Sequence, residues 1–519
     1  MRRTCTKREI GFFIVLILFC TARCLFRCFP DYDLWNRLIV GSAILDGFLF
    51  MREDIFSYIP AAHPLIDHEW GASVIFYSVF KFFHQNGLLF LKCLVNIGTM
   101  FLIYKTIALR KPKSAPPYNL FLYALAFMAA SYVLCATIRC QIFSFFFFAL
   151  FLYLLEKTRS GEFKHWWLFP LITVFWINIH AGCVAGIGMI FLYLIGEKLN
   201  GKKVDFYLKA FISSCLVTLI TPLGLEFVLF LFKSLSMNRE MISEWQSTFN
   251  SSHSYIYFKI YFFLMTFTAF YKLIKTFILK QNTDWTKWIV FAVVFYLSVA
   301  HMKHQPLFVF ATMILFYDDF YEVLRDYSGK ISDKITEKMV AVKEFIVYGA
   351  VIALSMVMLL PYHHLINLTY SDYPYRAIEF IRINNLRGNL FTPFKFGSYA
   401  AYKLFPYNKI GLDGRFEILF EPDLYYASNN FFLKQGEHWA DIIEVYPPDL
   451  LLIEKNYPVY DTILNMPEWA LAFEDNSVGV FVSAKLKKDS YLQPSSDREY
   501  YEKNMFGKNF EFSKRAERN

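Results

Sequence analysis

Acidic side chains gather in one stretch, directly after the first long apolar run of the chain. The stretch reads DYDLWNRLIVGSAILDGFLFMREDIFSYIPAAHPLIDHEW, and its acids include Asp31, Asp33, Asp54, Asp67 and Glu69. Charged groups beside a bilayer are costly, so a polar cluster at such a boundary indicates a functional site. A solvated loop whose acids face water is the alternative, and composition alone favours that alternative.

Composition decides the class of protein. Hydrophobic residues make up 56% of the 519 residues, and charged residues only 19%. Soluble domains carry about 25% charged residues, so this chain belongs with membrane proteins. The formal net charge is +9, but the basic residues lie in short loops between apolar runs. That distribution is typical of cytoplasmic loops, and it excludes nucleic acid as the expected partner.

Apolar runs of nearly bilayer length predict about eleven membrane spans, with the bilayer itself as a partner. They lie near 10–28, 87–105, 118–135, 141–156, 166–180, 183–198, 207–222, 255–279, 287–301, 304–318 and 345–361. The stretch 71–83 is predicted to be an amphipathic helix at the interface. The N-terminus lacks a small-residue cleavage site, so we predict a retained first helix rather than a signal peptide.

The basic loops predict the orientation. Four basic residues precede the first span, and every second loop is basic, so the N-terminus is expected in the cytoplasm. The acidic stretch and everything after Pro361 are then extracytoplasmic. Other unusual polar residues fall on that same predicted side: Arg139, Gln141, Asn178, His180, Glu244, His301, Lys303 and His304. This convergence is the main sequence argument for a site there.

The nine cysteines all lie in the apolar part of the chain. Cys20, Cys24 and Cys28 share one helical face, but no His or Asp spacing supports a zinc site. We interpret the cysteines as small apolar residues of spans, without a redox or metal role.

The composition changes near Pro361 to that of a soluble α/β domain. A helix is predicted over 375–385, a strand, turn and helix over LFTPFKFGSYAAYKLFP, and a short strand at KIGLDGR. DLLLIEK and VGVFVSAK are predicted as buried strands, with a helix at HWADIIEVY. The expected division is a polytopic domain over 1–361, whose outer loop covers 29–86, an α/β domain over 362–485, and a polar tail over 486–519.

Several motifs together resemble a known family. D-x-D-x-W, DIFSY and HEW of the acidic stretch, WINIHAG at 176–182, and HMKHQPLF at 301–308 occur in the order of bacterial GT-C glycosyltransferases. Residues 138–141 and 244–245, FKFGSYAAYKLFP and GLDGR continue the resemblance, which spans roughly residues 10–485. The nearest type is the polyprenyl-phosphate-dependent mannosyltransferase or arabinosyltransferase. Two departures, Asn36–Arg37 after the first Trp and Cys140 in place of Pro, put the substrate's identity in doubt rather than the fold.

The resemblance implies a GT-C-like helical bundle with a C-terminal extracytoplasmic α/β domain, in the bacterial inner membrane. It also implies transfer of a sugar from a polyprenyl-phosphate donor to a glycan, lipid or protein acceptor. An acid in the first outer loop would be the general base, with Asp33 the better match and Asp31 the second. The implied ligands of the donor phosphate are Arg139, His301, Lys303 and His304.

Each assignment has a structural alternative. Asp31 could only cap a helix or meet Arg37, and His180 beside Gly182 could only allow close helix packing. Asp67, His68 and Glu69 could hold a divalent metal, although acceptor binding or anchoring of the interfacial helix is favoured; no cofactor is certain. Glu244 is either a second acid or a rim residue. Asp413 and Arg415 form either an Asp-Gly turn with a salt bridge back to the membrane domain or an acceptor contact.

Two rival functions stay open. A transporter or flippase of lipid-linked sugars should carry broken helices with polar residues at mid-membrane. The polar residues gather at one predicted face instead, which argues against it. A catalytically silent GT-C scaffold is the other rival, and it predicts that Asp31 and Asp33 are dispensable. The sequence names neither the sugar nor the acceptor.

Overall fold

The computed structural model describes most of the backbone in two compact units. The described residues are 6–26, 28–47, 53–62, 67–112, 116–236, 243–250, 255–328, 333–360, 373–415, 419–497, 500–501 and 504–505. Unit 1 comprises Met1–Cys28 and Leu88–Leu365, and unit 2 comprises Phe29–Gly87 and Ile366–Asn519. The sequence-based division grouped 29–86 with the membrane-spanning part, whereas this segment packs in unit 2.

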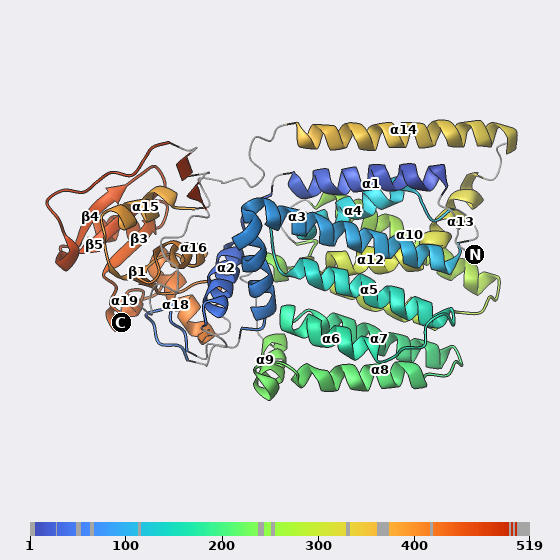
Figure 1. Cartoon of the computed structure of the whole chain (residues 1–519), viewed down its shortest axis with the longest axis horizontal. Helices are drawn as coiled ribbons and strands as arrows, with labels where there is room; N and C mark the ends of the chain where they lie inside the picture. Colours follow the sequence, from blue (N-terminus) through green and yellow to red (C-terminus); the bar gives the residue numbers. More distant parts are fainter. Residues whose placement is uncertain are drawn as a thin grey trace. The chain divides into compact units, whose positions relative to one another are not determined.

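Unit 1 is a bundle of long helices that lie side by side (Figure 1). They are α1 (Lys7–Leu25), the later part of α3 (Trp70–Arg110), α4 (Leu120–Cys135), α5 (Gln141–Arg159), α6 (Leu168–Ile179), α7 (Cys183–Leu199), α8 (Asp205–Leu216), α9 (Gly224–Ser236), α10 (Ile256–Ile278), α11 (Trp285–Ala300), α12 (Gln305–Leu315), α13 (Tyr317–Ser328) and α14 (Asp333–Leu359). Short 3-10 turns connect some of them: η1 (Val217–Leu219), η2 (Ser243–Trp245) and η3 (Met302–His304). Every predicted span overlaps one of these helices.

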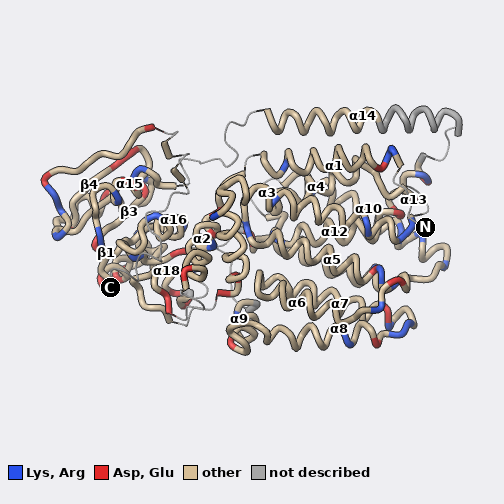
Figure 2. Tube along the Cα trace, in the orientation of Figure 1, with Lys and Arg blue, Asp and Glu red and all other residues tan. Residues whose placement is uncertain are grey.

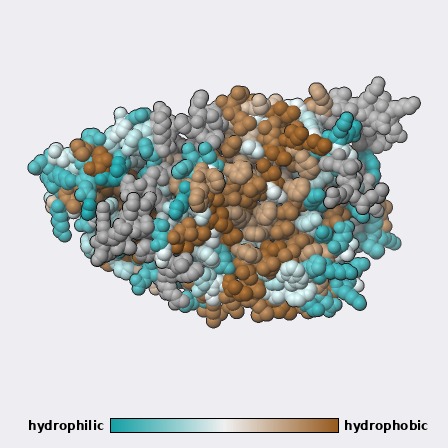
Figure 3. Space-filling view, viewed as in Figure 1, coloured by the Kyte–Doolittle hydropathy of each residue, from teal (hydrophilic) through white to brown (hydrophobic). Residues whose placement is uncertain are grey.

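Length and composition single out some of these helices as membrane spans. Among the described residues, three are long and apolar enough to cross a bilayer: Trp70–Arg110, Gln141–Arg159 and Ile256–Ile278. Asp205–Leu219 and Gly224–Ser234 together pass the same test but are bent by 108°. Large apolar side chains such as Phe90 and Phe277 are exposed on the bundle, and Figure 3 shows one such apolar face. This is a membrane protein by these criteria, and the count of about eleven spans stays a prediction.

The helix α3 belongs to both units. His84 has φ 52° and ψ −151°, so the helical geometry breaks there. The residues before the break are those of the predicted interfacial helix, and the boundary between the units follows at Gly87. Its unit 2 part packs against α2, because a Cβ built on Gly41 would lie 2.1 Å from the Ser73 carbonyl oxygen.

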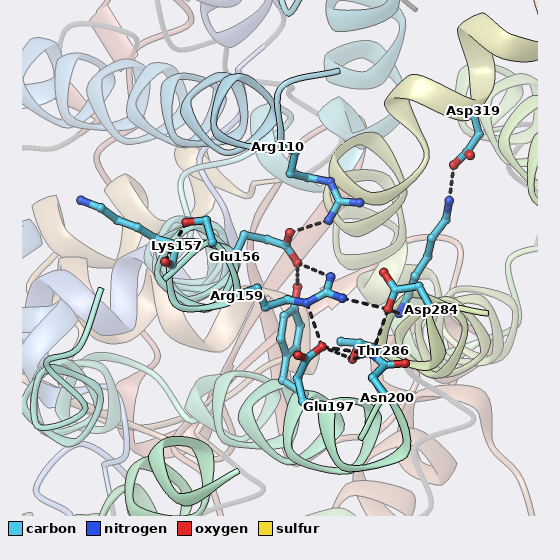
Figure 4. Close-up of polar contacts among 12 residues, drawn as sticks. Arg110, Glu156, Lys157, Arg159, Glu197, Asn200, Asp284, Thr286 and Asp319 are labelled. Carbon is cyan, nitrogen blue, oxygen red and sulfur yellow. Dashed lines mark hydrogen bonds and ion pairs between the residues drawn. The ribbon is translucent and has the colours of Figure 1, made fainter. Parts of the chain in front are cut away.

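Many charged residues of unit 1 gather at one end of its helices (Figure 2). Arg159 of α5 is at the centre of this cluster, with a guanidinium nitrogen 2.8 Å from Glu197 and another 2.8 Å from Asp284. Arg159 also contacts Glu156 at 3.2 Å, and Arg110 pairs with that same Glu156. Figure 4 shows these groups converging from α3, α5, α7 and the start of α11. The network therefore ties four helices together at the end that is predicted to face the cytoplasm.

We expect Arg159→Met to destabilise unit 1 by about 3 kcal/mol, because it leaves three acidic neighbours without their shared cation. Thermal unfolding in detergent, followed by tryptophan fluorescence, measures this. Lys157→Met is the matched control on the same helix, since among the residues that the structure describes the Lys157 ammonium forms no ion pair and lies 5.7 Å from the Tyr153 ring. Equal unfolding midpoints for the two variants would contradict a structural role for the network.

Unit 2 is an α/β domain built on one mixed sheet. Its strands are β1 (Gly388–Phe391), β2 (Asn408–Ile410), β3 (Leu450–Glu454), β4 (Trp469–Glu474) and β5 (Val478–Ser483), in the order β2-β1-β3-β5-β4. Strand β1 is parallel to β2 and β3, and β5 is antiparallel to β3 and β4. The helices are α2 (Tyr32–Leu45), α15 (Tyr375–Ile383), α16 (Phe394–Leu404), α18 (Pro422–Leu433), α19 (Asp441–Val445) and α20 (Val459–Leu464).

The predicted elements of this domain are present, and further ones were missed. The helix at 375–385, the strand and helix of LFTPFKFGSYAAYKLFP, and the strands at KIGLDGR, DLLLIEK and VGVFVSAK are confirmed. Strand β4 and helices α18 and α20 were not predicted. The largest difference is α2, since the sequence was interpreted as a loop there. Its residues Leu34–Ile44 are all buried, so tertiary packing rather than an amphipathic pattern holds this helix.

The acidic stretch also extends the sheet. The Tyr58 amide donates to the Ile410 carbonyl at 3.1 Å, and the Ile410 amide donates to Phe56 at 2.9 Å. Ser57 thereby forms a parallel bridge with the outer edge of β2. The DIFSY motif is thus a short edge segment of the α/β domain, which explains why residues so far apart in the chain form one unit.

Candidate functional site

The first turn of α2 carries both acids of the D-x-D motif. Asp31 is the N-cap, and its carboxylate accepts the Asp33 amide at 3.0 Å. A capping carboxylate satisfies a backbone N–H that otherwise has no partner at a helix start. The capping alternative for Asp31 therefore agrees with the structure. Asp33 follows inside the first turn, where the helix dipole favours a carboxylate.

Asp33 lies against the Asp413–Gly414–Arg415 turn. A Cβ built on Gly414 would lie 2.8 Å from the Asp33 carboxylate oxygen and 2.9 Å from the Asn36 amide nitrogen. It would also lie 3.2 Å from the Ser398 hydroxyl, which accepts the Gly414 amide at 3.2 Å. Only a residue without a side chain fits this position. The Asp413–Gly414–Arg415 turn and Asp33, the candidate base, are therefore in direct contact, although about 380 residues separate them in the sequence.

Buried ion pairs hold that turn in place. The Arg415 guanidinium donates to Asp54 at 2.7 Å and to Asp413 at 2.7 Å. All three side chains are at most 3% exposed. Asp54 additionally accepts the amides of Phe56 and Ser57, so it also shapes the edge segment of the sheet. The expected turn with a salt bridge is present, but the bridge does not lead to unit 1: its partner Asp54 lies in the segment Phe29–Gly87, which packs in unit 2.

The ion pair shifts the titration of its members. Burial alone would raise the pKa of Asp54, but the Arg415 charge and the hydrogen bonds outweigh burial and hold that pKa below its usual range. Burial likewise opposes the charge of Arg415, yet Asp413 and Asp54 raise its pKa, so it stays protonated. Asp54 and Arg415 are therefore both charged at neutral pH.

A pH dependence of stability follows from Asp54. A carboxyl with a lowered folded pKa stabilises the protein above its unfolded pKa, near 3.8, and this contribution disappears as the pH falls through the folded pKa. We expect the unfolding temperature of the wild type to fall as the pH drops below about 4. Asp54→Asn should flatten that dependence in a pH series of thermal unfolding. An unchanged slope would show that Asp54 does not couple to folding.

The acids of the predicted metal or acceptor triad already share a cation within unit 2. Arg37, which is buried, donates to Asp67 at 2.7 Å and lies 3.5 Å from Glu69. Arg37 also donates to the Ser73 hydroxyl at 3.1 Å. A cation held between two carboxylates disfavours a divalent metal on the same carboxylates. These contacts fit anchoring of the helix that begins at Trp70, and we derive no step through a metal.

The predicted phosphate ligands come together in unit 1. Arg139, from the turn between α4 and α5, forms an ion pair with Glu244 of η2. The next residue, Trp245, has the Lys303 ammonium 2.9 Å from its ring centroid. His301 Nδ1 lies 2.7 Å from the Trp245 carbonyl oxygen. The structure therefore links the candidate cations of two loops through Glu244 and Trp245 of a third.

His304 differs from the other members of that group. Burial, and then the charges of Lys303 and His301, lower its pKa to about 3. The imidazole is neutral at physiological pH, so His304 can donate or accept a hydrogen bond but supplies no positive charge. Arg139 and Lys303, rather than His304, therefore supply positive charge to the group.

His180 has a structural environment. Its Nδ1 lies 2.8 Å from the Ser144 hydroxyl and accepts the Gly182 amide at 2.9 Å. The Trp176 indole donates to that same hydroxyl at 2.7 Å. These bonds join the end of α6 to α5, as expected from the packing alternative.

Sequence reasoning missed three contributors to the site. Asp54 was counted among the acids but was not assigned a role, and Gly414 and Ser398 were not singled out. The DIFSY motif contains an acid, Asp54, and the DGR motif contains a base, Arg415. Their opposite charges are the sequence signal that could have predicted the pair. The contact of Gly414 with Asp33 depends on how close the Gly414 backbone lies to the Asp33 carboxylate, and no sequence pattern predicts it.

Comparison with solved structures decides the fold. An oligosaccharyltransferase of Archaeoglobus fulgidus, tethered to an acceptor peptide, matches with a TM-score of 0.57 and 10% identity over 86% of this chain and 69% of that chain. The archaeal oligosaccharyltransferase AglB of A. fulgidus, bound to an inhibitory peptide and a dolichol-phosphate, matches with a TM-score of 0.51 and 11% identity over 96% and 77%. The chain has a GT-C fold. No protein-family model and no curated protein matches the sequence.

The GT-C fold agrees with the architecture expected from the motifs, a helical membrane bundle with a C-terminal α/β domain. At such low identity the likeness establishes the fold and not the reaction. The roles of individual residues therefore have to be argued from their chemistry.

Proposed function

We propose that this protein is a membrane glycosyltransferase that moves a sugar from a polyprenyl-phosphate donor to an acceptor on the extracytoplasmic face. The GT-C fold, with likeness to oligosaccharyltransferases over most of the chain, carries the proposal. The two similar enzymes were captured with an acceptor peptide and with a dolichol-phosphate, which are an acceptor and a lipid phosphate of the proposed kinds. The proposed setting is the bacterial inner membrane, with a cytoplasmic N-terminus and an extracytoplasmic C-terminal domain.

Asp33 is the proposed general base. Its carboxylate takes the proton of an acceptor hydroxyl while that oxygen bonds to the anomeric carbon of the donor. The bond from the anomeric carbon to the phosphate oxygen breaks, and the polyprenyl phosphate leaves with its electron pair. Attack opposite the leaving group inverts the anomeric centre. Asp31 holds the helix that carries Asp33 and is the second choice for the base.

Arg139 and Lys303 are the proposed partners of the leaving phosphate. A guanidinium can bind phosphate oxygens in a bidentate manner, and an ammonium adds a compact charge. In the structure these cations contact Glu244 and Trp245. A donor phosphate would therefore compete with Glu244 for Arg139, which gives Glu244 the role of holding Arg139 in place between turnovers. His301 and neutral His304 would contribute hydrogen bonds.

Transfer by the purified protein tests the proposal. Wild-type protein in detergent is incubated with radiolabelled polyprenyl-phosphate hexoses and pentoses, with envelope extracts as the source of acceptors. We expect label to pass from the lipid to a polar product with one of these donors. No transfer across the whole donor panel, by protein with an intact unfolding transition, would contradict the proposed activity.

Transport of lipid-linked sugars is the second candidate. The 108° bend between α8 with η1 and α9 favours it, because transporters use broken helices. His301, Lys303 and His304 lie around Trp245, and Arg139 pairs with the adjacent Glu244; these groups suit a leaving phosphate, which is why transfer is preferred. Movement of a fluorescent lipid-phosphate sugar across proteoliposomes, without chemical transfer, would support transport instead.

A further inference from the structure

We infer that Lys92 and Cys28 form a covalent N–O–S bridge, made by dioxygen, that closes the chain segment inserted between the two parts of unit 1. The Lys92 ammonium nitrogen lies 2.9 Å from the Cys28 sulfur, and both side chains are completely buried. The sequence had been interpreted as giving the cysteines no redox role. The inference does not depend on the proposed transfer activity.

The surroundings of Lys92 are unusual for a buried ammonium. Its other described hydrogen bond goes to the Cys135 carbonyl oxygen at 2.9 Å. The titratable groups that face it are the thiols of Cys28, Cys24 and Cys135. Buried charges are normally paired with a group of opposite charge, and an ionisable residue in an apolar bundle is a functional hypothesis by default. Here a thiol takes the place that a carboxylate occupies elsewhere in this protein.

The position of the pair explains what a bridge would do. Cys28 is the last residue of unit 1 before the chain enters unit 2, and the chain returns to unit 1 at Leu88. Lys92 lies just after that return, in α3. A bond between the two side chains would therefore join the exit and the re-entry of the inserted segment Phe29–Gly87. This segment contains Asp33, Asp54 and Arg37, so the bridge would restrain the origin of the acidic stretch.

The chemistry balances with dioxygen as the oxidant. The Lys92 ammonium first releases one proton and reacts as the neutral amine. The S–H bond of Cys28, one N–H bond of that amine and the O–O bond then break, and S–O and N–O bonds form. One oxygen atom becomes the bridge, and the other leaves as water with the two hydrogens. Sulfur and nitrogen each lose two electrons, which together reduce one dioxygen molecule. Dioxygen is apolar and enters hydrocarbon surroundings, whereas soluble disulfides and peroxides are excluded from a fully buried pair.

A disulfide between Cys24 and Cys135 is the competing oxidation. Their sulfur atoms are 3.6 Å apart, and both side chains are completely buried. The Lys92–Cys28 distance is shorter, and that pair brings an amine together with a thiol. The two products differ in mass and in the peptides they join, so one measurement separates them.

Mass spectrometry of the full chain is the test. Protein from aerobic cells is purified without reductant and digested, and we expect one linked peptide pair containing Cys28 and Lys92, heavier than the sum of the two by about 14 Da. The link should disappear after a thiol reductant, and it should be absent from protein that is produced and handled without dioxygen. Cys28→Ser and Lys92→Arg should each lose it, while Cys20→Ser, at another buried cysteine, in α1, should keep it.

Three outcomes would overturn the inference. They are unlinked Cys28 and Lys92 peptides after exposure to dioxygen, a loss of about 2 Da from a Cys24–Cys135 disulfide alone, and a gain of about 16 Da on Cys28 without a link. The same link in protein made without dioxygen would show that dioxygen is not the oxidant. Each result is read on wild-type protein, so none depends on whether a variant folds.

Discussion

Asp33→Asn should lower the rate of sugar transfer by about 10²- to 10⁴-fold, the usual contribution of a positioned general base. The amide has the size of the carboxylate but cannot accept the proton of the acceptor hydroxyl. Because Asp33 stands in the first turn of α2, losing its charge also costs the helix about 0.5 kcal/mol. That cost is too small to unfold the protein. Initial rates at saturating donor, beside unfolding temperatures, measure both effects.

Asp31→Asn is the matched control for that experiment. Asn caps a helix about as well as Asp, so α2 should keep its start and the rate should fall by less than about threefold. The reverse pattern, with Asp31→Asn inactive and Asp33→Asn active, would assign the base to Asp31. Full activity in both variants would show that neither acid is the base. Absence of transfer by the wild type itself would favour the silent-scaffold alternative.

Arg415→Ala should destabilise unit 2 by about 3–5 kcal/mol, because it leaves two carboxylates buried without their cation. Asp54 and Asp413 are 3% and 2% exposed, so water cannot replace the guanidinium. The Phe56 ring, whose centroid is 4.7 Å from the guanidinium carbon, also loses a contact. Limited proteolysis and thermal unfolding in detergent should both report the loss, with cleavage concentrated in the C-terminal unit.

A neighbouring ion pair gives the control. Arg382 pairs with Glu379 in α15, but its side chain is 40% exposed. Arg382→Ala should therefore cost only about 0.5 kcal/mol, as exposed pairs usually do. Adding Asp54→Asn and Asp413→Asn to Arg415→Ala should recover part of the lost stability, because no charge is then left buried. Equal effects of the two single variants would contradict the structural role of Arg415.

Local patterns predicted most of the secondary structure. Each apolar run of nearly bilayer length coincides with a helix of unit 1, because such runs can be recognised from composition alone. Short apolar strands flanked by Gly, Pro or Asp likewise marked β1, β2, β3 and β5. The segment of α2 lacked such a signal, because it is buried on all sides and has neither the alternation of a strand nor the stripe of a surface helix.

The candidate site divides in the same way. The sequence by itself determined that this is a membrane protein, and it determined which acids and cations are unusual enough to be candidates. The tertiary structure decided which residue each of them contacts. The pairs are Asp33 with Gly414, Arg415 with Asp54, Arg37 with Asp67, Arg139 with Glu244, and Lys92 with Cys28. A charge in a sequence shows only that it needs a partner, and the choice of partner depends on contacts between distant segments, which composition and periodicity do not encode.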